Sequence, residues 1–350
     1  VVDGGELISA LQDRTVAHIR VEADVTLLLG QWPLNGVYLD RAVELTADPR
    51  ACATAFGEEG DAVEARTRCE LYVNANLFLR VLEGGILRAS NVSFSGGASA
   101  DNVGGIFTVA TGGALELTDC DVKQSTAAMG AAAFITASAS AGHNTTFTRV
   151  RFEDCAANGD TAWGGALYLN VAGGGSFVRI FDCDFVDNTA IGGRGGAIFA
   201  FGSSLIVRGS RFMRNIASSG GAIYVNGAAY IDGCEFDANE ARVAVGGAIA
   251  AVNHGLRIID SRFTHGYANA EAAAFFVYGA ANLVGCTFSA NTIVQRHHAD
   301  VYYCPDEDCK AWPEPTLALE EEFGLIAPRG IVPDDVLAAQ TKGPGYQSPQ

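Results

Sequence analysis

Hydrophobic and polar positions repeat along the middle of the chain at steps of 24 to 33 residues. One copy begins with GGAI at residues 220–223 and continues with CEFDAN at residues 234–239. Aligned copies give a column of large hydrophobic residues, which are Phe94, Val122, Phe152, Phe185, Phe212, Phe236, Phe263 and Phe288. A second such column stands five residues earlier and holds Leu117, Phe147, Ile180, Val207, Ile231, Ile258 and Leu283.

The repeated segments are short and rich in glycine and β-branched residues, which indicates strands separated by turns rather than helical repeats. We therefore predict a right-handed parallel β-helix, an all-β solenoid of about eight to nine coils with three strands in each coil. Equivalent positions of successive coils would lie about 4.8 Å apart. All nine prolines lie at or before Pro49 or at or after Pro305, outside the stack in which backbone N–H groups are needed.

The ends of the repeats divide the chain into three regions. Residues 1–70 are expected to form an N-terminal cap, residues 71–303 the β-helix, and residues 304–350 a C-terminal disulfide loop and extended tail. The elements expected within the cap are a short amphipathic helix and two strands, at Glu6–Gln12, His18–Leu29 and Val43–Thr46.

Charged residues of alternating sign directly precede the first hydrophobic column. They are Asp121, Arg151, Asp184, Arg211, Glu235 and Arg262. Adjacent strands place such side chains next to each other, where opposite charges attract and like charges repel. We expect this column to fix the register of the coils while each exposed pair adds little stability.

The nine cysteines form two groups by position. Cys52 and Cys69 flank a polar loop and are expected to form a local disulfide of an oxidising compartment. Cys304 and Cys309 bracket a short acidic loop and are expected to pair in the same way. The other five lie within the repeats and are expected to be free, buried thiols, since four of them share one column about 10 Å apart. They are Cys120, Cys155, Cys183, Cys234 and Cys286.

Two short patterns concern metal binding and glycosylation. His297 and His298 lie near Cys304 and Cys309, and zinc uses such ligands, but adjacent histidines diverge in a strand. We expect no metal and no other cofactor. The N-x-[ST] triplets at Asn91 and Asn144 are candidate glycosylation sites in a secreted chain, and Asn144 lies in a Ser/Ala/Gly-rich insertion.

Net charge and the distribution of apolar residues limit the classes of partner that the chain is expected to bind. The formal charge is −17 and only three lysines are present, which disfavours nucleic acid and anionic membranes. No apolar run approaches the roughly 20 residues of a membrane-spanning helix. The chain begins with valine and shows no signal peptide, so we interpret it as a processed or excised chain.

The G-G-A-[ILV] and F-x-x-N motifs resemble the repeats of the polymorphic outer-membrane-protein family of adhesins, within the pectin-lyase-like β-helix superfold. The resemblance covers roughly residues 84–303. It departs from the pattern at Val122, which replaces phenylalanine, and at residues 272–274, where AAA replaces GGA. Similar motifs occur in large eukaryotic surface proteins, so the resemblance implies an extracellular scaffold.

A further column follows the G-G-A-I position and is mostly aromatic. Its members are Tyr168, Phe199, Tyr224, Ala250, Phe276 and Tyr302. If the preceding aliphatic residue points inward, these rings point outward and offer an exposed stripe for a protein partner or a glycan. The alternatives are that a loop or the C-terminal tail covers the rings, or that they belong to the core.

Catalysis is the competing interpretation, because many β-helices cleave acidic polysaccharides. Asp182, Asp184 and Asp187 lie beside Arg151 and Arg211, as a carboxylate site for a sugar acid would require. The charges of Asp182 and Asp184 are already explained by alternating columns, the first by Asp119, Arg149 and Asp182 and the second by the column described above. The sequence therefore favours a non-catalytic extracellular structural or adhesion module that binds a protein or glycan within a larger surface assembly, with a polysaccharide lyase or glycoside hydrolase as the alternative.

Overall fold

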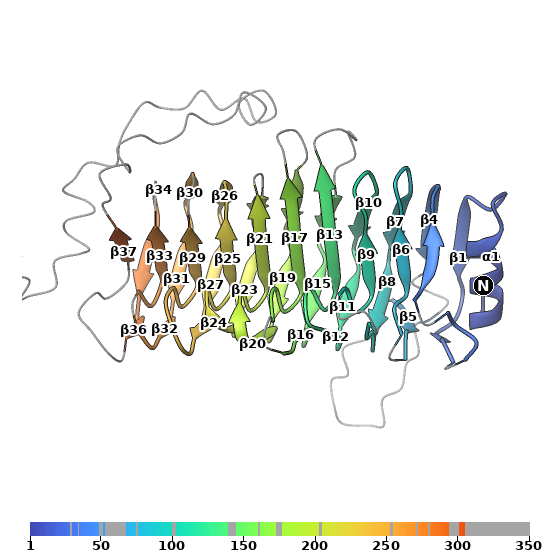
Figure 1. The fold of residues 1–350 in the computed structure, drawn as a ribbon, viewed down its shortest axis with the longest axis horizontal. Helices are drawn as coiled ribbons and strands as arrows, with labels where there is room; N and C mark the ends of the chain where they lie inside the picture. Colours follow the sequence, from blue (N-terminus) through green and yellow to red (C-terminus); the bar gives the residue numbers. More distant parts are fainter. Residues whose placement is uncertain are drawn as a thin grey trace, which may run out of the picture.

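The computed structural model describes residues 1–304 except 29, 34, 49–51, 53–67, 75, 100–102, 139–144, 160–161, 173–176, 203–204, 253–254, 271, 279–280 and 294–300. Within this part the chain is an all-β parallel solenoid, as predicted, whose strands stack along its long axis (Figure 1). Among the described residues, no helix is long and apolar enough to cross a membrane.

Each coil passes through up to four sheets, which we number in the order in which the chain enters them. Sheet 1 consists of β1 (His18–Val21), β4 (Ala42–Ala47), β7 (Ile86–Ser90), β10 (Ala114–Thr118), β14 (Thr145–Thr148), β18 (Val178–Phe181), β22 (Leu205–Arg208), β26 (Ala229–Asp232), β30 (Leu256–Ile259) and β34 (Ala281–Val284). Sheet 2 consists of β2 (Val25–Thr26), β5 (Cys69–Tyr72), β8 (Val92–Ser95), β11 (Asp121–Lys123), β15 (Arg151–Glu153), β19 (Asp184–Val186), β23 (Arg211–Met213), β27 (Glu235–Asp237), β31 (Arg262–Thr264) and β35 (Thr287–Ser289).

The other two sheets complete the coil. Sheet 3 consists of β12 (Thr126–Ala127), β16 (Ala156–Ala157), β20 (Thr189–Arg194), β24 (Ile216–Ser219), β28 (Glu240–Ala241), β32 (Tyr267–Ala268) and β36 (Thr292–Ile293). Sheet 4 consists of β3 (Val37–Leu39), β6 (Leu79–Val81), β9 (Phe107–Val109), β13 (Ala133–Ser138), β17 (Leu167–Ala172), β21 (Ile198–Gly202), β25 (Ile223–Asn226), β29 (Ile249–Val252), β33 (Phe275–Tyr278) and β37 (Val301–Cys304). The sequence analysis predicted three strands in each coil. Sheet 3 adds a fourth strand to the coils that pass through it. It forms because the residues after the turn stay extended and pair with the next coil.

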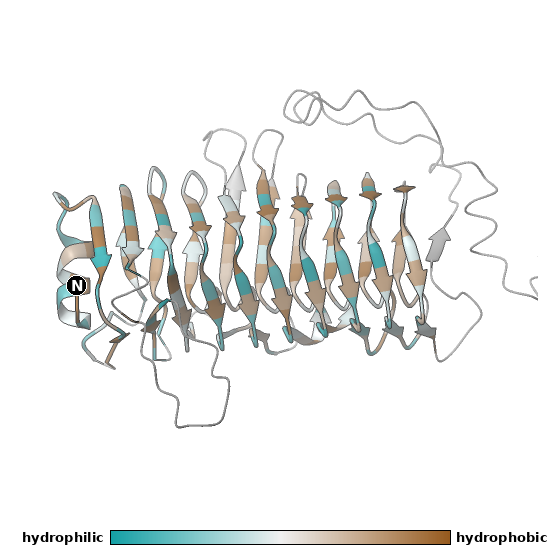
Figure 2. Cartoon of the chain, turned by 180° about the vertical axis from the view of Figure 1, so that it is seen from behind, coloured by the Kyte–Doolittle hydropathy of each residue, from teal (hydrophilic) through white to brown (hydrophobic). Residues whose placement is uncertain are grey.

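The predicted hydrophobic columns lie in register and fill the core. In sheet 2, Phe185 pairs with Phe152 on one side and Phe212 on the other, with ring centroids 4.8 Å and 4.7 Å apart. The column of sheet 1 is in register through Leu117 and Phe147 as well. Hydrophobic and hydrophilic bands alternate along the strands, as Figure 2 shows, because alternate side chains point inward and outward.

Buried asparagines hold the turn between sheet 2 and sheet 3. The Asn215 Oδ1 accepts hydrogen bonds from the backbone N–H of Asn188 at 3.1 Å and from its side-chain amide at 3.0 Å. Asn239 repeats this contact with Asn215 in the next coil. The residue before each, such as Asp187 with φ 55° and Arg214 with φ 53°, is left-handed and turns the chain. The ladder satisfies polar groups that the sharp turn would otherwise bury unpaired.

The glycine pair of the repeat has a steric cause. Gly195 has φ +67°, which favours glycine, and a Cβ on Gly196 would lie 2.0 Å from the carbonyl oxygen of Gly221 in the next coil. The chain is therefore closely packed from coil to coil at this corner.

The coils begin earlier than the sequence suggested. Strands β1 to β4 already belong to sheets 1, 2 and 4, so the expected cap over residues 1–70 contributes coils from His18 onward. The end itself is covered by α1 (Gly4–Gln12), which buries Leu7 and Leu11 against the first coil (Figure 1). Eight strands of sheet 2 carry the phenylalanine column, and β2 and β5 precede them. The predicted helix at Glu6–Gln12 is confirmed, with its start two residues earlier.

Candidate partner-binding groove

The predicted outward rings do lie outside the solenoid core. The residues before them, such as Ile198 and Ile223, are fully buried within it. Tyr168, Phe199 and Tyr224 therefore point to the outer face of sheet 4, where they form a cluster of their own. The Phe199 ring centroid lies 5.3 Å from that of Tyr168 and 5.4 Å from that of Tyr224, with nearly parallel planes.

These rings do not form the open stripe that the sequence predicted. Tyr168, Phe199 and Tyr224 are only 8%, 4% and 6% exposed. Each ring is covered by its stacked neighbours, and the Trp163 indole lies parallel to Phe199 at 5.1 Å. The remaining members of the column are Phe276, which is half-buried, and Tyr302, whose side chain lies outside the described residues.

A groove lies beside this cluster because one coil is shorter than both of its neighbours. The buried alanines of sheet 3 are in register, but the glycine that opens the next corner follows at different distances. Gly195 comes five residues after Ala190, and Gly246 comes five residues after Ala241. In the coil between them, the corresponding glycine, Gly220, comes only three residues after Ala217. The cavity above this short coil has a volume of about 580 Å³.

The two longer coils form the walls. In β20 the register shifts between Ala190 and Arg194, so that Gly192 and Gly193 bulge outward and line one side. Ala244 and Val245 line the opposite side. The residues next to these walls, Ile191 and Val243, are 58% and 64% exposed. The groove therefore has an apolar rim.

The floor combines rings, a hydroxyl-bearing strand end and one cation. The Arg194 guanidinium carbon lies 4.8 Å from the Tyr224 ring centroid, a cation–π contact. Ser219 lies beneath and donates its hydroxyl to the carbonyl oxygen of Val245 at 3.1 Å. In the next coil, Ala250 takes the ring position, so the aromatic column is interrupted where the cavity reaches it.

Sequence reasoning missed Trp163 and Arg194, which stand in a row beside the aromatic column. Backbone bridges link Met129 to Trp163 and Trp163 to Arg194, and Arg194 pairs with Ser219. The available signal was the number of residues between the alanine of sheet 3 and the glycine pair. This number is five, three and five in three successive coils, and a short coil between two longer ones predicts a depression in the surface.

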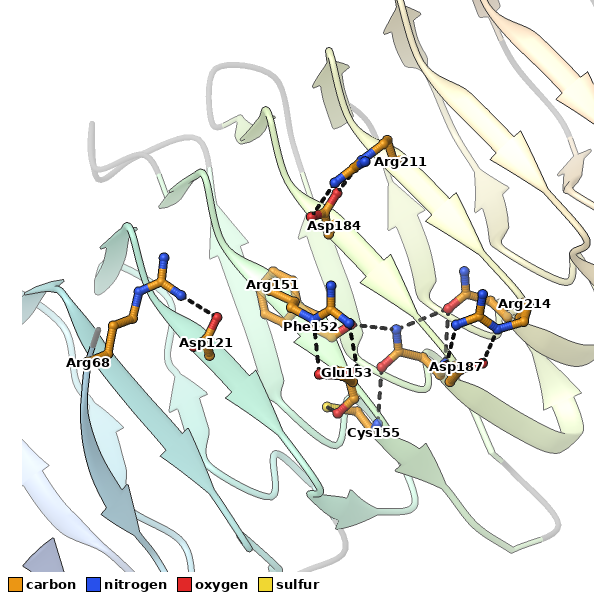
Figure 3. A network of polar contacts seen from close by, with 12 residues as sticks. Arg68, Asp121, Arg151, Phe152, Glu153, Cys155, Asp184, Asp187, Arg211 and Arg214 are labelled. Carbon is orange, nitrogen blue, oxygen red and sulfur yellow. Dashed lines mark hydrogen bonds and ion pairs between the residues drawn. The ribbon is translucent and has the colours of Figure 1, made fainter. Parts of the chain in front are cut away.

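Two of the three carboxylates considered for catalysis, Asp184 and Asp187, are held in ion pairs on the outer face of sheet 2 and its turn (Figure 3). The Arg211 guanidinium donates to both oxygens of Asp184, at 2.7 Å and 2.9 Å. Arg214 does the same for Asp187, at 2.8 Å and 2.7 Å. Both oxygens of each carboxylate are occupied by guanidinium hydrogen bonds, which leaves neither placed to exchange a proton with a substrate.

The predicted charge column is in register throughout, but not all of its side chains form ion pairs with their neighbours in the column. Asp121 contacts Arg68 at 2.5 Å, from the segment before the repeats. Arg151 donates to Glu153 on its own strand, at 2.9 Å and 2.7 Å, and this lowers the pKa of Glu153. Asp154, in contrast, has a raised pKa because of burial and the nearby negative charges of Glu153 and Asp187.

The structure contains the first predicted disulfide. Cys52 and Cys69 are bonded, with their Cα atoms 4.9 Å apart. Cys304 lies in β37, but its side chain and the whole of Cys309 lie outside the described residues. The five cysteines predicted to be free are Cys120, Cys155, Cys183, Cys234 and Cys286, and each is a free thiol. Burial raises the pKa of Cys120, Cys183 and Cys234 to about 12.

The remaining predicted positions are only partly described. Asn91 lies in the turn between β7 and β8 with φ 58° and is partly exposed, whereas Asn144 lies outside the described residues. His297 and His298 lie outside them too. In the part of the chain that is described, no group of three or more His, Cys, Asp or Glu side chains is arranged to hold a metal ion. Comparison with family models, curated proteins and solved structures finds no match to this chain.

Proposed function

We propose that the chain is a non-catalytic structural or adhesion module that binds a protein partner in the groove above residues 217–220. The observation that carries this proposal is the construction of the groove, with a floor of stacked rings between two apolar walls. A rigid floor loses little conformational freedom on binding, which favours affinity.

A protein is a better match than a glycan because of the rim. Ile191 and Val243 are large, exposed and apolar, and a peptide can cover them with apolar side chains. Sugar hydroxyls would lose hydration against these residues. The glycan alternative relies on the polar part of the cavity, Arg194 and Ser218, and on the Tyr224 ring.

An extracellular surface assembly is the proposed setting. The Cys52–Cys69 disulfide favours an oxidising compartment. The G-G-A-[ILV] and F-x-x-N motifs resemble those of polymorphic outer-membrane-protein adhesins within the pectin-lyase-like superfold. A stacked solenoid suits this role, since it offers a long and rigid surface. Catalysis on acidic polysaccharide is the second candidate, and the ion pairs of Asp184 and Asp187 weigh against it.

The proposal can be tested by selecting peptides from a displayed random library on the full chain, with a glycan array probed in parallel. Ser218→Trp places a large ring in the cavity from a partly exposed position of its lining, and Val284→Ser alters an exposed apolar residue of sheet 1 as a matched control. The proposal predicts peptides whose binding is lost in Ser218→Trp and kept in Val284→Ser.

Two results would overturn this function. One is binding of glycans alone through the groove. The other is new reducing ends or unsaturated products from pectin or alginate that disappear in Asp184→Ala, which would establish the enzyme.

A further inference from the structure

We propose that the groove selects an acidic peptide segment, in which a carboxylate binds Arg194 and an apolar side chain two residues away packs against Val243 and Val245. This inference rests on the proposed function, since it concerns the same groove. It adds the chemistry of the partner and the direction in which the partner lies across the groove.

The two ends of the groove differ in chemistry because of the residue that precedes the glycine of each corner. Arg194 pairs with Ser219 in the next coil, and the Ser219 hydroxyl donates to the carbonyl oxygen of Val245 in the coil after that. Ser219 is small and only 8% exposed, so the cavity lies above it, between Arg194 and Val245. These two residues are two strand spacings apart, which is about 10 Å. A ligand that spans the cavity therefore meets a cation at one end and an apolar side chain at the other.

Arg194 has its hydrogen-bonding capacity available for a ligand. It is the one charged residue that lines the cavity, and it contacts the Tyr224 ring by a cation–π interaction rather than by a hydrogen bond. In the described part of the chain, no carboxylate and no other acceptor engages the five N–H donors of its guanidinium. A carboxylate can accept two parallel hydrogen bonds from such a group. The exposed cation therefore favours an acidic residue of the partner at this end.

The opposite end of the groove offers an apolar surface. Val243 is 64% exposed at the rim, and Val245 and Val252 line the cavity and pack against the aromatic cluster. Covering these side chains removes apolar area from water, which stabilises the complex. An aliphatic or aromatic side chain of the partner is the group that gains most here.

The positive charge next to this apolar end is already neutralised. Arg242 directly precedes Val243, but its Nη2 atom lies 3.1 Å from Oε2 of Glu240. An acid of the partner gains less from a guanidinium that already has a carboxylate than from one that has none. The carboxylate is therefore expected at Arg194 and not at Arg242, which fixes the direction of the peptide.

The width of the groove fits an acid and an apolar residue on one face of an extended peptide. Side chains two residues apart point to the same face and lie about 6.6 Å apart, and their own length covers the rest of the distance between Arg194 and Val245. The expected pattern is thus an Asp or Glu, any residue, and then an apolar residue, in either chain direction. An acidic sugar could supply the carboxylate, but its hydroxyl groups would lose hydration against the valines.

The test compares peptides selected from a displayed random library on the wild-type chain with those selected on Arg194→Glu. The wild-type chain should enrich an acid two positions from an apolar residue, and Arg194→Glu should enrich Lys or Arg at the acidic position. Fluorescence anisotropy on one selected acidic peptide should show binding at least tenfold weaker in Arg194→Glu. The same peptide with lysine in place of the acid should bind Arg194→Glu again, which shows that the variant is folded. Arg242→Glu is the matched control and should change the affinity less than twofold.

The outcomes separate this inference from the proposed function. If selected peptides lose binding in Ser218→Trp but show no acidic position and bind Arg194→Glu equally well, the groove binds peptides and the acidic partner is overturned. If Arg242→Glu weakens binding as much as Arg194→Glu does, the assigned direction is overturned. If no peptide binds to any variant, both ideas are overturned. Acidic glycans that bind in place of peptides, and are lost in Arg194→Glu, would also overturn the peptide partner.

Discussion

Asp184 and Arg211 lie side by side on adjacent coils, 27 residues apart in sequence, and form a bidentate ion pair on the outer face of sheet 2. Their register is that of the alternating charge column. The Arg211 side chain is 53% exposed, so the pair is screened by water and salt and adds little net stability. The pair acts mainly on the register of the coils, because a shifted register would place like charges next to each other and destabilise the fold.

Reversing one charge of this column should destabilise the fold modestly. Arg211→Glu places three acids on successive strands, from Asp184 to Glu235, and should cost about 1 kcal/mol at low salt and less at high salt. Urea unfolding at two salt concentrations measures this. The double exchange Asp184→Arg with Arg211→Asp should recover most of the loss, and no recovery would show that the two residues do not interact.

Removing one asparagine of the turn ladder should be more costly. Asn215→Ala leaves the backbone N–H of Asn188 and the carbonyl oxygen of Phe185 without their side-chain partner inside the protein. We expect a loss of about 2–3 kcal/mol in the free energy of unfolding. Asn158→Ala, at an exposed position, is the control and should change it by less than about 0.5 kcal/mol. Equal losses in both variants would contradict a special role for the ladder.

The aromatic cluster should contribute to stability despite its place outside the core. Phe199 is 4% exposed between two stacked rings, so Phe199→Ser should cost about 2–4 kcal/mol. Val243→Ser, at the exposed rim, should leave the unfolding midpoint almost unchanged. Thermal or urea unfolding of both variants measures the difference. A neutral Phe199→Ser would mean that the ring is an open surface, as the sequence alone suggested.

The buried thiols should make the fold sensitive to alkaline pH. Burial raises the pKa of Cys234 to about 12 from an ordinary value of 9.0. The folded state therefore holds the proton more tightly, and this stabilisation is complete below about pH 9 and is lost as the pH rises towards 12. Unfolding midpoints between pH 8 and 10.5 should fall less steeply in Cys234→Ser, because serine does not titrate in this range. The substitution should fit, since Ser210 and Ser261 already occupy this column in the adjacent coils.

The same burial should protect the thiols from alkylation. Native protein at pH 8 should react slowly, since the thiolate is the reactive form. After denaturation without reduction, mass spectrometry should find label on Cys120, Cys155, Cys183, Cys234 and Cys286. Cys52 and Cys69 should stay unlabelled because they form a disulfide. A disulfide among the first five would contradict the stacking of the coils.

Much of the architecture could be predicted because a solenoid repeats one structural unit that contacts only the adjacent units. Each coil contacts its neighbours through equivalent positions, so columns in the sequence become neighbours in space. Phe185 and Phe212 were aligned by counting residues, and their rings stack at 4.7 Å. Asp184 and Arg211 were aligned in the same way. The start of the coils was misplaced, since β1 to β4 lack the glycine pair and the phenylalanine by which the repeat was recognised.

The fold and the register follow from the sequence alone, because equivalent positions recur from coil to coil and become neighbours in space. Whether the aromatic column faces outward, and how exposed its rings are, depended on the packing of the coils against one another. Tyr224 points outward, yet Phe199 and Arg194 cover it, and that contact depends on a bulge in β20. The groove likewise arises from a difference in length between three adjacent coils, so its depth is a property of the stack and of no single coil.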